Sequence, residues 1–270
     1  MSVLQAKELT VAFNGVKVLS DLNLMIPSGR ITALVGGNGS GKTTLLRVLG
    51  RLLKPTHGSA LLDAKEISHL SSKELARSLG ILPQTPVAPE GLTVRELVTQ
   101  GRYPYQSWYQ QWSKEDEHMV EKALTTTHLL DLADRQLDSL SGGQRQRAWI
   151  AMVLAQDTPT LLLDEPTTYL DLAHQVEILD LLDELNATQG RTIVMVLHDL
   201  NQACRYAHNI IVLQAGQIMS IGKPDEIITE ELVRQAFAVE CQIIPDPLTG
   251  TPLCLPIRRK TQVAAHAPLT

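Results

Sequence analysis

Aromatic residues are scarce in this sequence. They make up 4% of its 270 residues, as two Phe, three Trp and five Tyr. A chain with so few aromatic side chains fills its core mainly with Leu, Ile, Val and Ala. Half of the aromatic residues nevertheless lie in one short segment: Tyr103, Tyr105, Trp108, Tyr109 and Trp112. This clustering points to a local role for the segment.

Long hydrophobic runs are missing as well. The longest, residues 148–155, is far shorter than the roughly 18 apolar residues that cross a bilayer. Residues 1–7 contain no basic segment followed by an apolar one, so we expect no secretory signal. Both absences favour a soluble, cytoplasmic chain.

Cysteine and an excess of positive charge are lacking too. Cys204, Cys241 and Cys254 are odd in number and widely spaced, which fits neither a disulfide framework nor a zinc site. A reducing compartment is the simplest interpretation.

An excess of positive charge is also lacking, because Lys and Arg number 24 against 29 Asp and Glu, which gives a net charge of −5. A dedicated nucleic-acid-binding protein would usually be basic, so that class is disfavoured.

The sequence does contain alternating strands and helices. Residues 30–36, 160–164 and 191–198 are apolar runs typical of strands that are covered on both faces, as in a parallel sheet. Residues 174–186 have the periodicity of an amphipathic helix, and Gly190 suits its end. We therefore predict an α/β fold.

Three segments depart from this alternation. Residues 3–27 have the short alternating pattern of antiparallel strands. Residues 86–155 contain no convincing strand and predict a helical insertion, with one helix opening at Thr93 and a second over residues 116–132. The tail, residues 240–270, begins with a predicted hairpin around a Pro/Gly turn.

A glycine-rich segment after the first apolar run fits the phosphate-binding pattern G-x-x-x-x-G-K-[ST]. Glycines let consecutive backbone N–H groups turn toward a phosphate, and the following helix directs its positive end to the same anion. Its lysine would reach the β- and γ-phosphates, and the next hydroxyl would ligate Mg²⁺. A plain strand-to-helix turn is the alternative, although a chance match has odds of about 1%. The segment comprises Gly36, Gly37, Asn38, Gly39, Ser40, Gly41, Lys42, Thr43 and Thr44.

Two acids follow the run at residues 160–163. Asp164 would hold Mg²⁺ directly or through water, and Glu165 would polarise the attacking water. Taken alone the pair is a weak signal, because many strands end in two acids.

A third motif combines Ser141, Gly142, Gly143 and Gln144 before a helical run. Ser141 and Gln144 match a capping box, so an ordinary helix start is one interpretation. The two glycines remove side chains around exposed N–H groups at a positive helix end, which favours an anion site.

With these motifs in order, the sequence resembles the ATP-binding cassette (ABC) ATPases over nearly its whole length. Leu-Ser-Gly-Gly-Gln is that family's signature. By resemblance, Gln84 matches the loop that senses Mg²⁺ and the γ-phosphate, and Asp171 matches the loop that contacts an opposite subunit. His198 matches the switch histidine at the γ-phosphate, and Phe13 the aromatic residue that stacks on adenine.

The resemblance implies a P-loop (RecA-like) core with a parallel sheet, an N-terminal antiparallel β subdomain and an inserted helical subdomain. It implies that residues 1–270 form a single ABC ATPase domain. Two positions depart from the family pattern. Gly37 stands where Pro is common, and Phe13 stands where Tyr is more usual, which removes a hydroxyl contact.

The resemblance also implies a partner. Two copies would bind head to tail, with each ATP between the phosphate loop of one copy and Ser141, Gly143 and Gln144 of the other. One phosphate loop disfavours a twin-cassette translation factor, and the lack of a long heptad insertion disfavours a chromosome or repair ATPase. The lack of spans implies separate membrane permease subunits.

Several segments, including residues 101–105, 164–172 and 197–206, are similar to the ATPase subunits of ferric-siderophore importers. Vitamin B12 and haem importers are near alternatives; a soluble cassette acting on nucleic acid and a P-loop kinase are more remote ones. We expect a peripheral protein on the cytoplasmic face of the inner membrane, which meets an extracytoplasmic substrate-binding protein only indirectly and binds no nucleic acid.

The aromatic segment at residues 103–112 lies inside the predicted helical insertion. A small local core is one interpretation. Our hypothesis is that part of it borders the surface that receives a short permease helix, because Tyr and Trp combine apolar area with a polar handle.

Overall fold

A six-stranded sheet lies at the centre of the computed structural model, which describes residues 3–106 and 112–257. The strand order is β10-β9-β3-β8-β7-β6; β10 is antiparallel to β9 and the others are parallel. This confirms the predicted α/β fold. The strands are β3 (Ile31–Val35), β6 (Leu79–Leu82), β7 (Thr160–Leu163), β8 (Thr192–Val196), β9 (Asn209–Gln214) and β10 (Gln217–Gly222).

The sheet separates two hydrophobic cores. In β3, Ile31, Ala33 and Val35 pack into one core, and Leu34 between them packs into the other. Because successive side chains of a strand point to opposite faces, a fully apolar strand is the one that can fill both cores. The apolar runs of the sequence are therefore explained by burial on both sides.

The second core is closed by a four-stranded sheet of order β2-β1-β4-β5. The predicted antiparallel pair is confirmed by β1 (Leu4–Phe13) and β2 (Val16–Ile26). The pair is extended by β4 (His57–Leu62) and β5 (Lys65–Glu66), which follow α1 (Lys42–Leu49) and were not predicted. β4 is only half apolar, and its pairing with β1 is a long-range contact that local patterns do not reveal.

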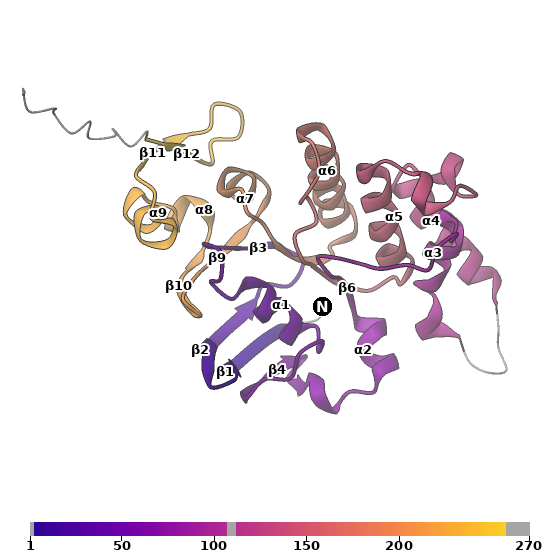
Figure 1. Cartoon of the computed structure of the whole chain (residues 1–270), viewed down its shortest axis with the longest axis horizontal. Helices are drawn as coiled ribbons and strands as arrows, with labels where there is room; N and C mark the ends of the chain where they lie inside the picture. Colours follow the sequence, from indigo (N-terminus) through magenta and orange to yellow (C-terminus); the bar gives the residue numbers. More distant parts are fainter. Residues whose placement is uncertain (1–2, 107–111, 258–270) are drawn as a thin grey trace, which may run out of the picture.

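Residues 86–155 form a helical region that projects to one side of the sheet (Figure 1). Within its described part, β structure is limited to one isolated bridge, Thr93 with Gln136. The expected second helix is shorter than predicted, because it ends at Thr126 and His128 has a φ of 55°. The region contains α3 (Val94–Gln100), η2 (Tyr103–Tyr105), α4 (Lys114–Thr126), η3 (Leu130–Leu132), η4 (Leu137–Ser139) and α5 (Gly142–Ala155).

The remaining elements complete the chain. The predicted hairpin of the tail is confirmed by β11 (Cys241–Pro245) and β12 (Pro252–Pro256). In the described residues, no helix has the length and apolar character that a bilayer span requires. The other helices are η1 (Ile67–His69), α2 (Ser72–Ser78), α6 (Leu172–Gln189), α7 (Leu200–Tyr206), α8 (Pro224–Ile227) and α9 (Glu230–Phe237).

Candidate active site

The glycine-rich loop connects β3 to α1 in a conformation that requires glycine at several positions. Gly36 has a φ of 147°, and a Cβ atom there would lie 2.1 Å from the carbonyl oxygen of Leu213. At Gly41, with a φ of 102°, a Cβ would lie 2.5 Å from Leu19 Cδ2. By contrast, a Cβ at Gly37 would meet its nearest atom only at 3.6 Å. The backbone conformation of the loop therefore explains why glycine is required at positions 36 and 41 and not at position 37.

Lys42, the first residue of α1, places its ammonium group inside this loop. Its Nζ donates to the carbonyl oxygens of Gly36 at 2.9 Å and Gly37 at 3.0 Å. Burial lowers the pKa of Lys42, and the nearby Glu165 and Asp164 oppose that shift. A buried cation beside a helix N-terminus forms a site for a polyanion such as a nucleotide phosphate.

Asp164 lies next to the loop although it comes from another strand. One strand, β8, separates β3 from β7, and the side chains cross this gap: Thr43 Oγ1 donates to Asp164 Oδ1 at 2.9 Å. Asp164 Oδ2 is buried, with no hydrogen-bond partner among the described residues. Burial raises the pKa of Asp164, and the Thr43 hydrogen bond opposes the shift. A hydroxyl and a carboxylate with a free oxygen are ligands suited to Mg²⁺.

Glu165 is held by residues from two further segments and by Thr168 of its own loop. His198 Nε2 lies 2.7 Å from Glu165 Oε1, and Thr168 Oγ1 donates to Glu165 Oε2 at 2.9 Å. The Gln84 side chain lies near enough to contribute to lowering the pKa of Glu165. Burial alone would raise the pKa of Glu165, but the hydrogen bonds from His198 and Thr168 outweigh it and hold the pKa below its ordinary value. The carboxylate is therefore ionised at neutral pH, as a general base must be.

These residues meet because parallel strands bring their carboxyl ends to one edge of a sheet. Gln84 follows β6, Glu165 follows β7 and His198 follows β8. The structure thus brings together the phosphate loop, both acids, Gln84 and His198, as predicted. Thr168 is a partner of Glu165 that sequence reasoning missed, and only its spacing of three residues could have indicated it.

The signature residues form a second group. Ser141 caps α5: Gln144 N–H donates to Ser141 Oγ at 3.2 Å, and Ser141 N–H donates to Gln144 Oε1 at 3.1 Å. The predicted capping box is confirmed. A Cβ at Gly142, which is exposed, would meet Leu170 Cδ2 only at 3.9 Å, whereas Gly143 is buried.

Asp171 caps α6 in a similar way. Its Oδ1 accepts from the backbone N–H of His174 at 3.0 Å and lies 2.7 Å from His174 Nδ1. The His174 ring also covers Gly143, where a Cβ would lie 2.2 Å from His174 Cδ2. The structure therefore joins Asp171 to the signature through a histidine that sequence reasoning missed.

The other residues that we predicted to contact the nucleotide lie at the edge of the site. Phe13 ends β1 with 48% of its surface exposed, so its ring is free to stack on a planar group. Asn38 and Gly39 are exposed at the tip of the loop, and Thr44 is half-buried in α1.

The aromatic segment divides into unlike parts. The Tyr105 ring lies 3.9 Å beneath the guanidinium carbon of Arg102, which is 2% exposed and bonded to Asp116. Tyr105 is therefore half-buried and packs against arginine side chains of its own chain. Tyr103 is 61% exposed, and Trp112 Nε1 donates to Glu117 at 2.9 Å. Trp108 and Tyr109 lie outside the described residues.

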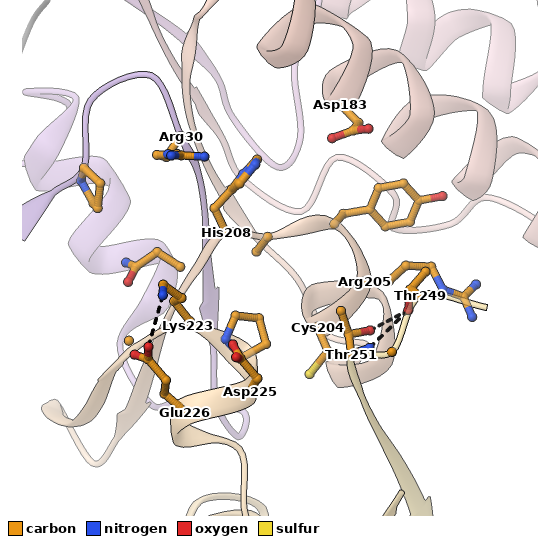
Figure 2. Close-up of a pocket in the computed structure, with 17 residues that line it drawn as sticks. Arg30, Asp183, Cys204, Arg205, His208, Lys223, Asp225, Glu226, Thr249 and Thr251 are labelled. Atoms are coloured by element: carbon orange, nitrogen blue, oxygen red, sulfur yellow. Dashed lines mark hydrogen bonds and ion pairs between the residues drawn. The ribbon is translucent and has the colours of Figure 1, made fainter. Parts of the chain in front are cut away.

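A cavity of about 830 Å³ lies away from all of these residues (Figure 2). Arg30 precedes β3 and His208 precedes β9, so this cavity sits at the amino ends of these two strands. The phosphate loop follows the opposite, carboxyl end of β3. Its charged groups include the internal ion pair Lys223–Glu226 at 3.1 Å. None of the predicted site residues lines it.

Comparison with known proteins shows the family to which the chain belongs. The family described as ABC transporter matches residues 19–168. The petrobactin import ATP-binding protein FpuD of Bacillus anthracis is 59% identical, over 98% of each chain. The ferric enterobactin transport ATP-binding protein FepC of Escherichia coli K12 is 50% identical, over 98% of this chain and 97% of its own.

Solved structures agree as well. An inward-facing transporter described as of the metal-chelate ABC type matches with a TM-score of 0.82 and 29% identity, over 95% of this chain and 98% of its own. The dimeric structure of MJ0796, a bacterial ABC transporter cassette, matches with a TM-score of 0.73 and 32% identity, over 82% and 98%.

Proposed function

Because the chain belongs to the ABC transporter family, and is an ATPase of that family, we propose that it powers import of an iron(III)–siderophore or related iron chelate through separate membrane permease subunits. The observation that carries the cargo class is the near full-length identity to FpuD and FepC, whose names specify petrobactin and ferric enterobactin. Because these two cargoes differ, we propose iron chelates as a class and do not assign one particular chelate.

The first group of residues handles the nucleotide in this proposal. Backbone N–H groups of the phosphate loop and the Lys42 ammonium bind the phosphates, and Phe13 stacks on the base. Thr43 and Asp164 hold Mg²⁺, with Gln84 beside them; when bound, the ion neutralises charge on the phosphates. Glu165 accepts a proton from the attacking water, and His198 contacts the γ-phosphate while it orients Glu165.

The second group acts on the nucleotide of a second copy. The N-terminus of α5, with Ser141, Gly143 and Gln144, offers N–H groups and a positive helix end to a phosphate outside its own chain. Asp171 lies beside it and contacts the opposite subunit. The dimeric MJ0796 structure supports two cassettes working as a pair.

The proposed location of the protein depends on its permease subunits. With no described helix suited to a span, the protein associates peripherally with the membrane through permease subunits, on the cytoplasmic face. It meets the extracytoplasmic binding protein only indirectly and binds no nucleic acid. We also propose that residues 1–270 form a single ATPase domain, into which residues 86–155 are inserted as a helical subdomain.

Cargo uptake tests the proposal. In a host strain lacking the gene, wild-type protein should restore uptake of a radioiron-labelled siderophore, and Glu165→Gln should not. His69→Ala serves as the matched control, because His69 is an exposed histidine remote from the site. Restored uptake of cobalamin or haem, with none of any iron chelate, would contradict the cargo class.

The permease contact needs a separate test. Tyr103, exposed on the helical region, is proposed to border the docking surface. Tyr103→Ala should lower chelate uptake while basal ATP hydrolysis and the melting temperature stay unchanged. Tyr105→Ala should instead lower the melting temperature, because its ring stacks on Arg102. Undiminished uptake with Tyr103→Ala would place the permease elsewhere.

A further inference from the structure

His174 lies where two loops of the second group meet. It is the third residue of α6, and Figure 1 shows α6 beside α5, whose first turn carries the signature glycines. One side of the His174 ring faces Asp171, through Nδ1 at 2.7 Å from Oδ1. Its Cδ2, Cγ and Nε2 atoms would lie 2.2, 2.6 and 2.9 Å from a Cβ on Gly143.

These distances mean that the ring occupies the volume that a side chain at position 143 would need. Gly143 is buried although it sits in the first turn of a helix, in a motif whose Ser141 and Gly142 are exposed. The His174 ring therefore covers the backbone of Gly143 on the side that faces α6. Gly143 needs to be glycine for a reason inside its own chain, apart from any ligand.

We propose that His174 is a positioning residue that fixes the signature turn and Asp171 in one mutual geometry, so that both reach the second copy together. This rests on the proposed head-to-tail pair of cassettes. Binding across an interface improves when the contacting groups are already held in their bound arrangement. A ring that donates to Asp171 and packs on Gly143 holds both at once.

A second contact between the same helices separates positioning from ordinary packing. Arg147 of α5 lies 3.3 Å from Glu177 of α6, one turn further along each helix. That pair also joins α5 to α6 but touches neither Gly143 nor Asp171. Glu177→Ala is therefore a matched control, which loosens the helix pair without releasing the two loops.

The experiment measures ATP-dependent dimerisation in a Glu165→Gln background, by sedimentation velocity. His174→Ala should raise the dimer dissociation constant about tenfold over the Glu165→Gln parent. Binding of ATP to the monomer, which uses the phosphate loop, should change by less than about twofold. Glu177→Ala should lower the melting temperature without this loss of dimer affinity.

One further variant keeps the test decisive if His174→Ala folds poorly, and a second variant checks the packing if His174→Ala folds well. His174→Asn retains a donor for Asp171 but covers less of Gly143, so its dimer affinity should fall between parent and His174→Ala. Gly143→Ala should lower the melting temperature less in a His174→Ala chain than in the parent, because the clash is gone.

The outcomes are distinguishable. Dimer affinity in His174→Ala equal to that in Glu177→Ala would overturn the positioning role while leaving the proposed function intact. If the Glu165→Gln parent itself forms no dimer with ATP, the head-to-tail arrangement is wrong, and the role of His174 is wrong with it.

Discussion

The two groups of functional residues differ in how the fold holds them. The phosphate loop, Asp164 and Glu165 are bonded to one another or to strand ends, and Lys42 and Asp164 are 6% and 2% exposed. Ser141 and Gln144 are hydrogen-bonded to each other at the exposed N-terminus of α5. The first group is therefore buried around Lys42 and Asp164 and exposed at Phe13 and at the tip of the loop. The second group lies at the surface.

The difference has a physical cause. Carboxyl ends of parallel strands converge, so side chains far apart in sequence meet and bury one another. The first turn of a helix has N–H groups with no partner in the helix, and small residues leave them open to an outside anion. Under the proposed function, one chain therefore carries two unlike half-sites, and two copies in opposite orientation would complete both.

The largest expected effect separates chemistry from binding within the first group. Glu165→Gln removes the carboxylate but keeps a side chain of the same shape, so ATP hydrolysis should fall by about 100- to 10,000-fold while ATP affinity is kept. Steady-state hydrolysis and equilibrium binding measure the two. Wild-type turnover in this variant would refute the assignment of the base.

Mixing two inactive variants tests whether the half-sites work across copies. Lys42→Ala removes a phosphate contact from the first group, and Ser141→Arg blocks the second; neither protein alone should hydrolyse ATP. An equal mixture should recover up to about a quarter of the wild-type rate, because half of the random pairs are mixed and each holds one intact site.

The matched control for the mixture uses both substitutions in one chain. Mixed with wild type at equal amounts, this double variant leaves every mixed pair without an intact site. The pairs of wild type alone should then account for all activity. No recovery in the first mixture would show that each chain works with its own signature.

Two neighbouring glycines test how tightly the first group is built. Gly36→Ala should destabilise the protein by about 2–4 kcal/mol and weaken nucleotide binding, because the new Cβ would meet the Leu213 carbonyl. Gly37→Ala should stay within about 0.5 kcal/mol, since its nearest atom is at van der Waals distance. Urea unfolding compares them. Equal losses would mean that the loop adapts.

The smallest expected effect is a gain in stability. Burial raises the pKa of Asp164, so its ionised form costs stability at neutral pH, and that cost disappears once the group is protonated. Asp164→Asn should therefore raise the melting temperature by about 2–4 °C at neutral pH while it impairs hydrolysis.

The sign of the pH dependence follows from the same shift. The gain from Asp164→Asn should shrink as the pH falls through the raised pKa of the folded-state carboxyl, because wild type then carries a neutral group as well. Calorimetry at neutral pH and at about pH 4 measures this. A gain that is constant with pH would mean that the ionised carboxylate is not the cause.

The sequence by itself determined the chemistry of this protein and much of its architecture. The glycine spacing before Lys42, the acids after an apolar run and the glycines after Ser141 are local patterns, set by backbone geometry and helix ends. They indicated a phosphate loop, a pair of acids and an anion site, whereas the pairing of two copies was implied only by the resemblance to ABC ATPases. The parallel core was predicted from apolar runs, the helical insertion from the lack of strand patterns over residues 86–155, and the tail hairpin from its Pro/Gly turn. The shortened α4 shows the limit, because a break at residues 127–128 carries no strong stop signal.

The tertiary structure alone decided how these parts are held together. β4 joined the N-terminal sheet, and Thr168 became a partner of Glu165. Tyr105 packs against Arg102, while Tyr103 stayed exposed. His174 packs on Gly143 from another helix, thirty-one positions further along the chain. Such contacts depend on which faces meet after folding, and a local pattern carries information only about the neighbours of a residue in sequence.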